Sequence, residues 1–145
     1  MKKGFSLIEL MLVIVIMAIL IMMVYPDYQQ YVRHTKRIEA QAELTALAKQ
    51  LQRYKVVNLT FLKANGKPIT LVDIGEKKML YLPRAGRPLY QIKLSQVGIN
   101  SWLLTATPLQ HSTQWQDGGF ALNHRGEKCW IQGLAKCVPS ATSQW

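Results

Sequence analysis

Acidic side chains, cysteines and histidines are all scarce in this sequence. Its 145 residues contain 8 Asp or Glu against 18 Lys or Arg, with only 2 cysteines and 3 histidines. The two cysteines do not form a Cys-x-x-Cys pair of the kind that binds zinc. His34, His111 and His124 are scattered and lack partners at metal-ligand spacing. The sequence therefore predicts neither a metal site nor a cofactor.

Motifs for catalysis and for ordinary secretion are also missing. Ser95, Ser101 and Ser112 do not stand in a nucleophile elbow, and no glycine-rich phosphate-binding motif occurs. A secretory signal is cut at an A-x-A-like site after its apolar region, and no such site stands between Val24 and Tyr28. The chain is therefore expected not to be an enzyme, and an ordinary signal peptide is disfavoured.

A single carboxylate, Glu9, precedes an uncharged apolar run from Leu10 to Val24. A helix from Phe5 to Tyr25 is about 31 Å long, which matches the hydrocarbon thickness of a bilayer. A charge near such a segment costs about 2.5 to 3.5 kcal/mol on insertion scales, so a charged residue there is expected to have a function. A plain membrane anchor is the alternative, but it leaves Glu9 unexplained.

The residues just before Glu9 suggest a partner for its negative charge. Gly4 is small and lies at the polar border of the apolar run, behind two lysines. A peptidase that cuts after Gly4 leaves a new cationic amine on Phe5. That amine and Glu9 then form a matched pair of charges in a medium of low dielectric constant.

Residues 2–10, Lys-Lys-Gly-Phe-Ser-Leu-Ile-Glu-Leu, resemble the class III signal of type IV pilins and of their relatives in type II secretion. The resemblance continues through residues 25–33 and 37–42, which look most like minor type IV pilins of the PilE kind. In that family a prepilin peptidase cuts after the glycine and methylates the new amino terminus. The resemblance implies that Gly4 is the cleavage site and Phe5 the N-methylated residue. It also implies that Glu9 meets a neighbouring subunit's amine during assembly.

The same resemblance implies an organisation and a set of partners. The expected parts are a leader peptide at residues 1–4, a transmembrane and assembly half of a helix at 5–27 and a globular pilin domain at 28–145. The expected partners are other pilins, major and minor, the prepilin peptidase and the pilus assembly machinery. The precursor and mature pool are expected in the bacterial inner membrane, from which the subunit enters a cell-surface pilus.

Apolar residues beyond Pro26 keep a helical spacing. Five of them fall on one stripe, at i, i+3, i+4 and i+7 positions, as expected for a helix face packed on a core. These residues are Leu44, Leu47, Ala48, Leu51 and Tyr54. We therefore predict one long helix from about Phe5 to about Val56.

Later segments change to the alternating pattern of strands. The expected strands are Leu89–Ser95, Trp102–Thr107, Gly119–Asn123 and about Glu127–Ile131, with turns at Val97–Ser101 and Asn123–Gly126. Asn58–Gly86 is expected to connect the helix to the sheet, and the polar tail Val138–Trp145 to fray. The prediction is an α+β fold in which the long helix packs on an antiparallel sheet of about four strands, as in pilins.

Cys129 and Cys137 lie close together near the end of the chain. A disulfide between them is favoured, because a chain exported across a membrane meets an oxidising compartment. Two free thiols are the alternative.

The excess of positive charge, formally +10, favours anionic partners. Four cations cluster near two tyrosines, a mixture suited to phosphate contacts and base stacking. The cations are Lys77, Lys78, Arg84 and Arg87, and the tyrosines are Tyr81 and Tyr90. Four phosphate contacts predict a slope of log affinity against log salt of about 3.6 in magnitude. Ordinary solvated charges are the alternative.

Three functions are compatible with these features. The first is a minor pilin, a structural subunit that is assembled into a type IV pilus or initiates it and supports adhesion, twitching motility or DNA uptake. The second is a pilus-borne DNA receptor for natural transformation. The third is a type II secretion pseudopilin, which shares the N-terminal signal, although the stretch from Tyr25 to Arg33 favours the pilus.

Overall fold

The structure is a computed structural model that describes residues 6–145, apart from the side chain at position 26. Gly4 and Phe5, the predicted cleavage and methylation sites, lie outside the described residues. The chain divides into two compact units, one ending at Thr35 and the other comprising Lys36–Trp145. The predicted domain boundary at residue 28 stays a prediction.

Helix α1, Leu7–Asn58, supplies the first unit and continues into the second. In the first unit its side chains from Leu7 to Tyr25 are exposed, and the helix is long and apolar enough to cross a membrane. In the second unit the predicted stripe is confirmed, because Leu44, Leu47 and Leu51 are fully buried. The helix ends where Leu59 adopts a left-handed conformation, with φ of 61°.

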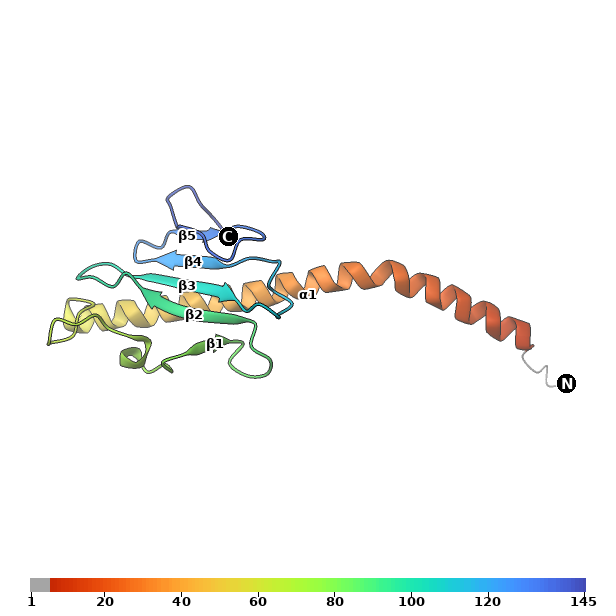
Figure 1. Ribbon diagram of the computed structural model, residues 1–145, viewed down its shortest axis with the longest axis horizontal. Helices are drawn as coiled ribbons and strands as arrows, with labels where there is room; N and C mark the ends of the chain where they lie inside the picture. Colours follow the sequence, from red (N-terminus) through yellow and green to blue (C-terminus); the bar gives the residue numbers. More distant parts are fainter. Residues whose placement is uncertain (1–5) are drawn as a thin grey trace. The chain divides into compact units, whose positions relative to one another are not determined.

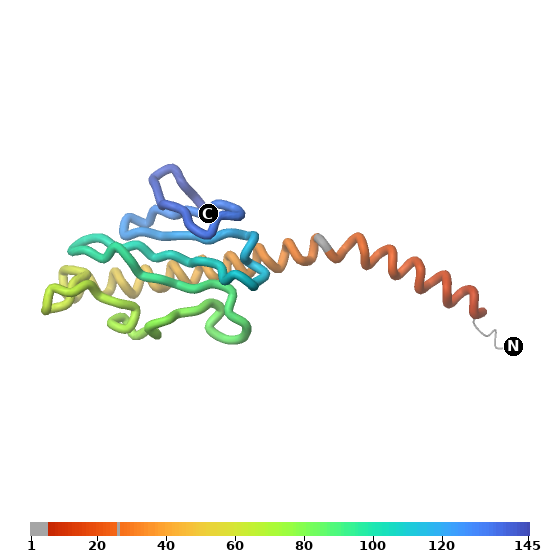
Figure 2. Tube along the Cα trace, in the orientation of Figure 1, coloured from red at the N-terminus to blue at the C-terminus, as the bar shows by residue number. Residues whose placement is uncertain are grey.

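The second unit contains a five-stranded antiparallel sheet in which each strand pairs with the next along the chain (Figures 1 and 2). The strands are β1 (Leu80–Leu82), β2 (Tyr90–Ser95), β3 (Leu103–Pro108), β4 (Phe120–Asn123) and β5 (Lys128–Trp130). One face of the sheet packs on the second half of α1, and strands β1 and β5 form its opposite edges.

The α+β fold with an antiparallel sheet is confirmed, and the sheet has five strands where about four were expected. The missed strand, β1, lies inside the segment predicted to connect helix and sheet. Its three residues are too few to show an alternating pattern, and it forms by pairing with β2, Leu80 opposite Ile92. The same segment contains a short 3₁₀ helix, Leu71–Ile74.

The expectation that the C-terminal tail frays is wrong. The ring of Trp145 packs edge-on against Phe120 at a centroid distance of 5.8 Å, and the backbone of Gln144 accepts a hydrogen bond from the Trp130 amide. The tail looks polar in sequence, yet its last residue is a large apolar side chain that finds a place beside the core.

Residues 36–145 hold every buried core residue of the described chain. The disulfide and all the ion pairs of the described residues lie in the same unit. This unit therefore has its own core, which is the property expected of a domain that can fold alone.

Candidate functional site

Glu9 is placed in the first turn of α1, after Ser6, whose carbonyl accepts the first backbone hydrogen bonds of the helix. A carboxylate there interacts favourably with the positive end of the helix dipole. Glu9 is exposed, and no basic side chain forms an ion pair with it among residues 6–145. Its charge is thus available to a cation on another molecule.

The basic cluster predicted from the sequence falls at and beside the β1 edge of the sheet. Lys77 and Lys78 precede β1 and are exposed, and neither forms an ion pair within the described part of the chain. Lys77, Tyr81 and Arg84 line one pocket of about 470 Å³. The fold therefore brings a free ammonium group, a guanidinium group and an aromatic ring to one place.

Arg84 is not a free cation. Its Nη1 and Nη2 donate to Glu76 at 2.7 and 2.9 Å, and its Nε donates to Glu43 of α1 at 3.2 Å. The hydrogen bonds from Arg84 lower the pKa of the Glu76 carboxyl. The hydrogen bonds to Glu76 and Glu43 raise the pKa of the Arg84 guanidinium. Arg84 ties the segment before β1 to the helix, and its positive charge is balanced.

The remaining members of the predicted cluster differ from one another. Arg87 is exposed and donates one hydrogen bond to the His111 carbonyl at 3.2 Å, which leaves its charge uncompensated. Tyr90 is fully buried and donates to Gln114 at 3.0 Å. Burial raises the pKa of Tyr90, and the nearby Asp117 charge adds to the shift. The idea that Tyr90 stacks on a base is wrong, because Tyr90 faces the core from β2.

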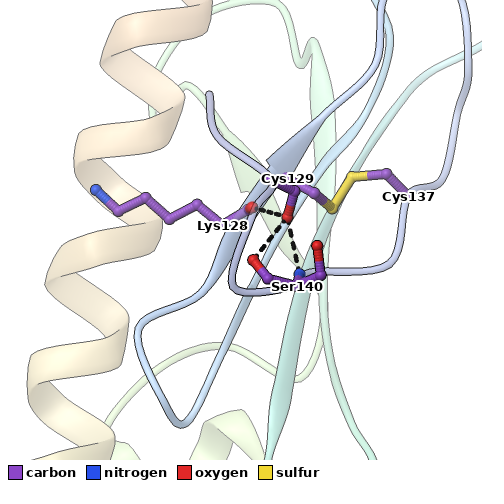
Figure 3. The surroundings of a disulfide bond; sticks show 5 residues. Lys128, Cys129, Cys137 and Ser140 are labelled. Carbon is purple, nitrogen blue, oxygen red and sulfur yellow. Dashed lines mark hydrogen bonds between the residues drawn. A yellow bond between two sulfur atoms is a disulfide. The ribbon is translucent and has the colours of Figure 1, made fainter.

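Cys129 and Cys137 are joined by a disulfide, as predicted (Figure 3). The bridge ties β5 to the C-terminal loop. Beyond it the backbone amide of Ser140 donates to Ser143, whose hydroxyl donates in turn to the Lys128 carbonyl. Lys128 itself extends from β5 toward α1 in Figure 3.

A buried ion pair holds the β5 side to α1. Arg37 donates to Asp117 at 2.7 Å, and both side chains are at least 85 % buried. The Arg37 guanidinium also lies 3.9 Å from the Trp130 ring centroid, and Trp130 donates to the Asp117 carbonyl at 2.9 Å. The sequence argument missed this cluster because Arg37 and Asp117 are 80 residues apart.

Gly118 and Gly119 let the C-terminal loop approach the start of β4. Gly118 has φ of +94°, a conformation that favours glycine, and a side chain there would meet the Ile131 carbonyl. A side chain at Gly119 would meet the Ala135 carbonyl, and the Gly119 amide donates to Leu134 at 2.7 Å. The pair Gly-Gly after Asp117 was the only sequence signal for this contact.

No group of three or more His, Cys, Asp or Glu side chains is arranged to hold a metal ion within residues 6–145. What the described part of the chain offers is a long apolar helix and a basic edge. Two family models match the sequence. Residues 1–25 match the model of the prokaryotic N-terminal methylation motif, and residues 26–118 match "Type IV minor pilin ComP, DNA uptake sequence receptor". The chain belongs to this family of minor type IV pilins.

Two relatives agree with this assignment, and a solved structure shares the fold. Two fimbrial proteins of Pseudomonas aeruginosa are each 31 % identical to the minor pilin, over 97 and 91 residues. These matches cover 67 and 63 % of this chain but only 63 and 59 % of the relatives' own length. A crystal structure of the Neisseria meningitidis non-core minor pilin PilV has a TM-score of 0.53 and 17 % identity. It covers 76 % of this chain and 96 % of that one, and it shows the same fold.

Proposed function

We propose that this minor pilin is a pilus-borne DNA receptor that contacts DNA through the β1 edge. The observation that carries the proposal is the pair of exposed ammonium groups of Lys77 and Lys78, which form no ion pair within residues 6–145 and lie beside the pocket lined by Tyr81. The description of its family, a DNA uptake sequence receptor, supports the same function.

The structure changes how many phosphate contacts are expected. Arg84 is balanced by Glu76 and Glu43, so it positions the edge instead of contacting DNA. Lys77, Lys78 and Arg87 remain. Each neutralised phosphate contributes about 0.9 to the slope of log affinity against log salt, so three contacts predict a slope of about 2.7 in magnitude.

The experiment measures duplex DNA binding by residues 28–145 across a series of salt concentrations. A Lys77→Gln/Lys78→Gln variant should weaken binding and lower the slope by about 1.8, because two phosphate contacts are lost. The matched control is Lys67→Gln/Lys136→Gln, which removes the same charge from exposed sites outside the edge. Equal slopes for the two variants would show that the binding depends only on net charge.

A second measurement tests whether the β1 edge distinguishes between DNA sequences. Phosphate contacts position a protein on DNA, whereas contacts to base edges specify the sequence. Tyr81, which lines the pocket, is the aromatic side chain placed to contact a base. Fragments of the host genome should compete better than foreign DNA of equal length for the wild type. Tyr81→Ala should reduce that preference while leaving the salt slope unchanged.

Incorporation into the pilus is proposed to follow cleavage after Gly4, N-methylation of Phe5 and pairing of Glu9 with a neighbouring subunit's amine. The methylation-motif match to residues 1–25 supports these steps, as does the free carboxylate of Glu9. We infer that the precursor waits in the inner membrane. The proposed partners are other pilins, the prepilin peptidase and the assembly machinery.

Two measurements test this assembly route. Mass spectrometry of sheared pili should find a chain that starts at methylated Phe5, and residues 1–4 still attached would contradict the processing step. Glu9→Gln should remain in the membrane but enter pili poorly, because it cannot attract an amine as a carboxylate does. Ser6→Ala is the control, since it changes the helix start without removing the charge.

A further inference from the structure

A groove separate from the β1 edge lies between the second half of α1 and the β4–β5 side of the sheet. Its volume is about 550 Å³, within the range of roughly 300–1,000 Å³ that small-molecule sites occupy. The lining is predominantly apolar and includes Ala48, Val56, Val57 and Leu122. Because β1 and β5 are opposite edges of the sheet, an occupant here does not compete with DNA at β1.

Basic side chains surround this apolar surface. Lys49, Arg53 and Lys128 line the groove, and no Asp or Glu is among its lining residues. None of the three forms an ion pair within residues 6–145, although the Lys128 ammonium lies 5.1 Å from the Trp145 ring centroid. The groove thus combines an apolar floor with a rim of one charge sign.

One lining residue has a buried hydrogen-bond donor that is not open to an occupant of the groove. Trp102 lines the groove and is 2 % exposed, and its indole Nε1 has no hydrogen-bond partner within the described residues. A buried donor without a partner costs free energy. The same low exposure means that the ring offers no open face on which a nucleic acid base could stack.

We propose that this groove binds a single-chain anionic amphiphile, such as a fatty acid. Its chain covers Ala48, Val56 and Leu122, and its carboxylate pairs with the rim cations. Charge complementarity selects this occupant over a second copy of the chain, because two surfaces from a protein of net charge +10 repel each other. DNA is disfavoured because its charged phosphates gain no favourable contact with the aliphatic floor of the groove.

The test titrates laurate, below its micelle concentration, into residues 28–145 and follows the heat of binding. Laurate should bind saturably with one molecule per chain. Dodecanol, with the same chain length but no charge, should bind at least about tenfold weaker, and acetate should not bind. Binding by dodecanol as tight as that of laurate would overturn the proposal, as would the absence of laurate binding.

Variants at the rim and the floor localise the site. Lys49→Gln/Arg53→Gln should weaken laurate binding about tenfold or more and leave dodecanol unchanged. Ala48→Leu should block the floor, and Ala46→Leu, exposed on the same helix, is its matched control. Val56→Glu places a repelling carboxylate at a side chain that is 77 % exposed, so it tests the groove without disturbing the core.

Three further results decide between the occupants. Equal loss of laurate binding in the Ala46→Leu control would overturn the assignment to the groove. Dimerisation of the laurate-free protein that Val56→Glu abolishes would also overturn it, in favour of a second copy. A Lys77→Gln/Lys78→Gln variant should bind laurate as the wild type does, so a failed DNA proposal leaves this result unaffected.

Discussion

The two edges of the sheet are held to the rest of the domain in different ways. On the β5 side a disulfide, a buried ion pair and the Trp130 ring join the C-terminal loop to β4 and α1. On the β1 side Leu80 and Leu82 pack in the core, and the ion pair to α1 is that of Glu43 with Arg84, whose side chain is 46 % exposed. Exposed pairs contribute little stability, whereas a buried pair is costly to break. The β5 side is thus held to α1 by a buried ion pair, while the β1 side is held to α1 by an exposed pair and keeps exposed cations beside it.

The largest effect is expected from Arg37→Ala. This change leaves the Asp117 carboxylate buried without its main cation and removes the contact with Trp130. Breaking a buried pair from one side typically costs about 3–5 kcal/mol, and we expect about 3 kcal/mol because the pair is not completely buried. Urea denaturation of residues 28–145 measures it. Lys36→Ala, which removes an exposed pair with Glu39, is the control and should cost under about 1 kcal/mol.

The outcome for Arg37 can be sharpened with a second variant. Arg37→Met/Asp117→Asn removes both charges and should recover much of the lost free energy of unfolding. If the double variant is as unstable as Arg37→Ala, the loss comes from packing on Trp130 and not from the stranded carboxylate.

Removal of the disulfide should come next in size. In the chain-entropy model a loop as short as that between Cys129 and Cys137 contributes about 2.5 kcal/mol. Cys129→Ala/Cys137→Ala should lower the free energy of unfolding by about this amount and make it insensitive to reductant. A variant whose stability equals that of the oxidised wild type would show that the buried ion pair alone holds the β5 side.

Arg84→Gln should have a smaller effect, about 1 kcal/mol or less, since Arg84 is 46 % and Glu43 35 % exposed, although Glu76 is only 9 % exposed. The variant should also lose the depression of the Glu76 pKa. A carboxyl whose folded pKa is lowered stabilises the fold above its unfolded pKa and loses that contribution as the pH falls through the folded value. The stability difference between wild type and variant should therefore shrink in acid, below about pH 4.5.

The smallest effect is expected at Asp73, which precedes β1. Hydrogen bonds from Lys63 and Thr70 lower the pKa of Asp73 from 3.8 to about 2. By the same sign argument, its contribution is complete above about pH 4 and disappears as the pH falls toward 2. Asp73→Asn should flatten the pH dependence of the melting temperature in that window only. A change at pH 7 as large as that from Arg84→Gln would contradict this order.

The N-terminal motif and most of the fold could be predicted because their signals are local. The spacing of Leu44, Leu47 and Leu51 along a helix specifies a buried face, and alternation specifies strands of four or more residues. Strand β1 was not predicted because it has only three residues and depends on pairing with β2. The packing of Trp145 was not predicted either, because its place beside Phe120 depends on a distant part of the chain.

The candidate DNA site was predicted only in part. The clustering of Lys77, Lys78, Arg84 and Arg87 is visible in the sequence, but the charge that each one offers is not. Arg84 meets Glu43 across 41 residues, and Tyr90 turns into the core because β2 presents it to α1. Such pairings arise only when helix and sheet come together, and they decide which cations remain free.

By itself, the sequence determined the long apolar N-terminal helix, the helix-on-sheet class and the pairing of two cysteines. These follow from local period, from composition and from the presence of a single possible disulfide. Only the tertiary structure decided the neutralisation of Arg84, the buried pair of Arg37 and Asp117, and the cationic groove beside Lys128. The physical reason is that electrostatic and packing energies depend on distances in space, which residues far apart in the chain acquire only on folding.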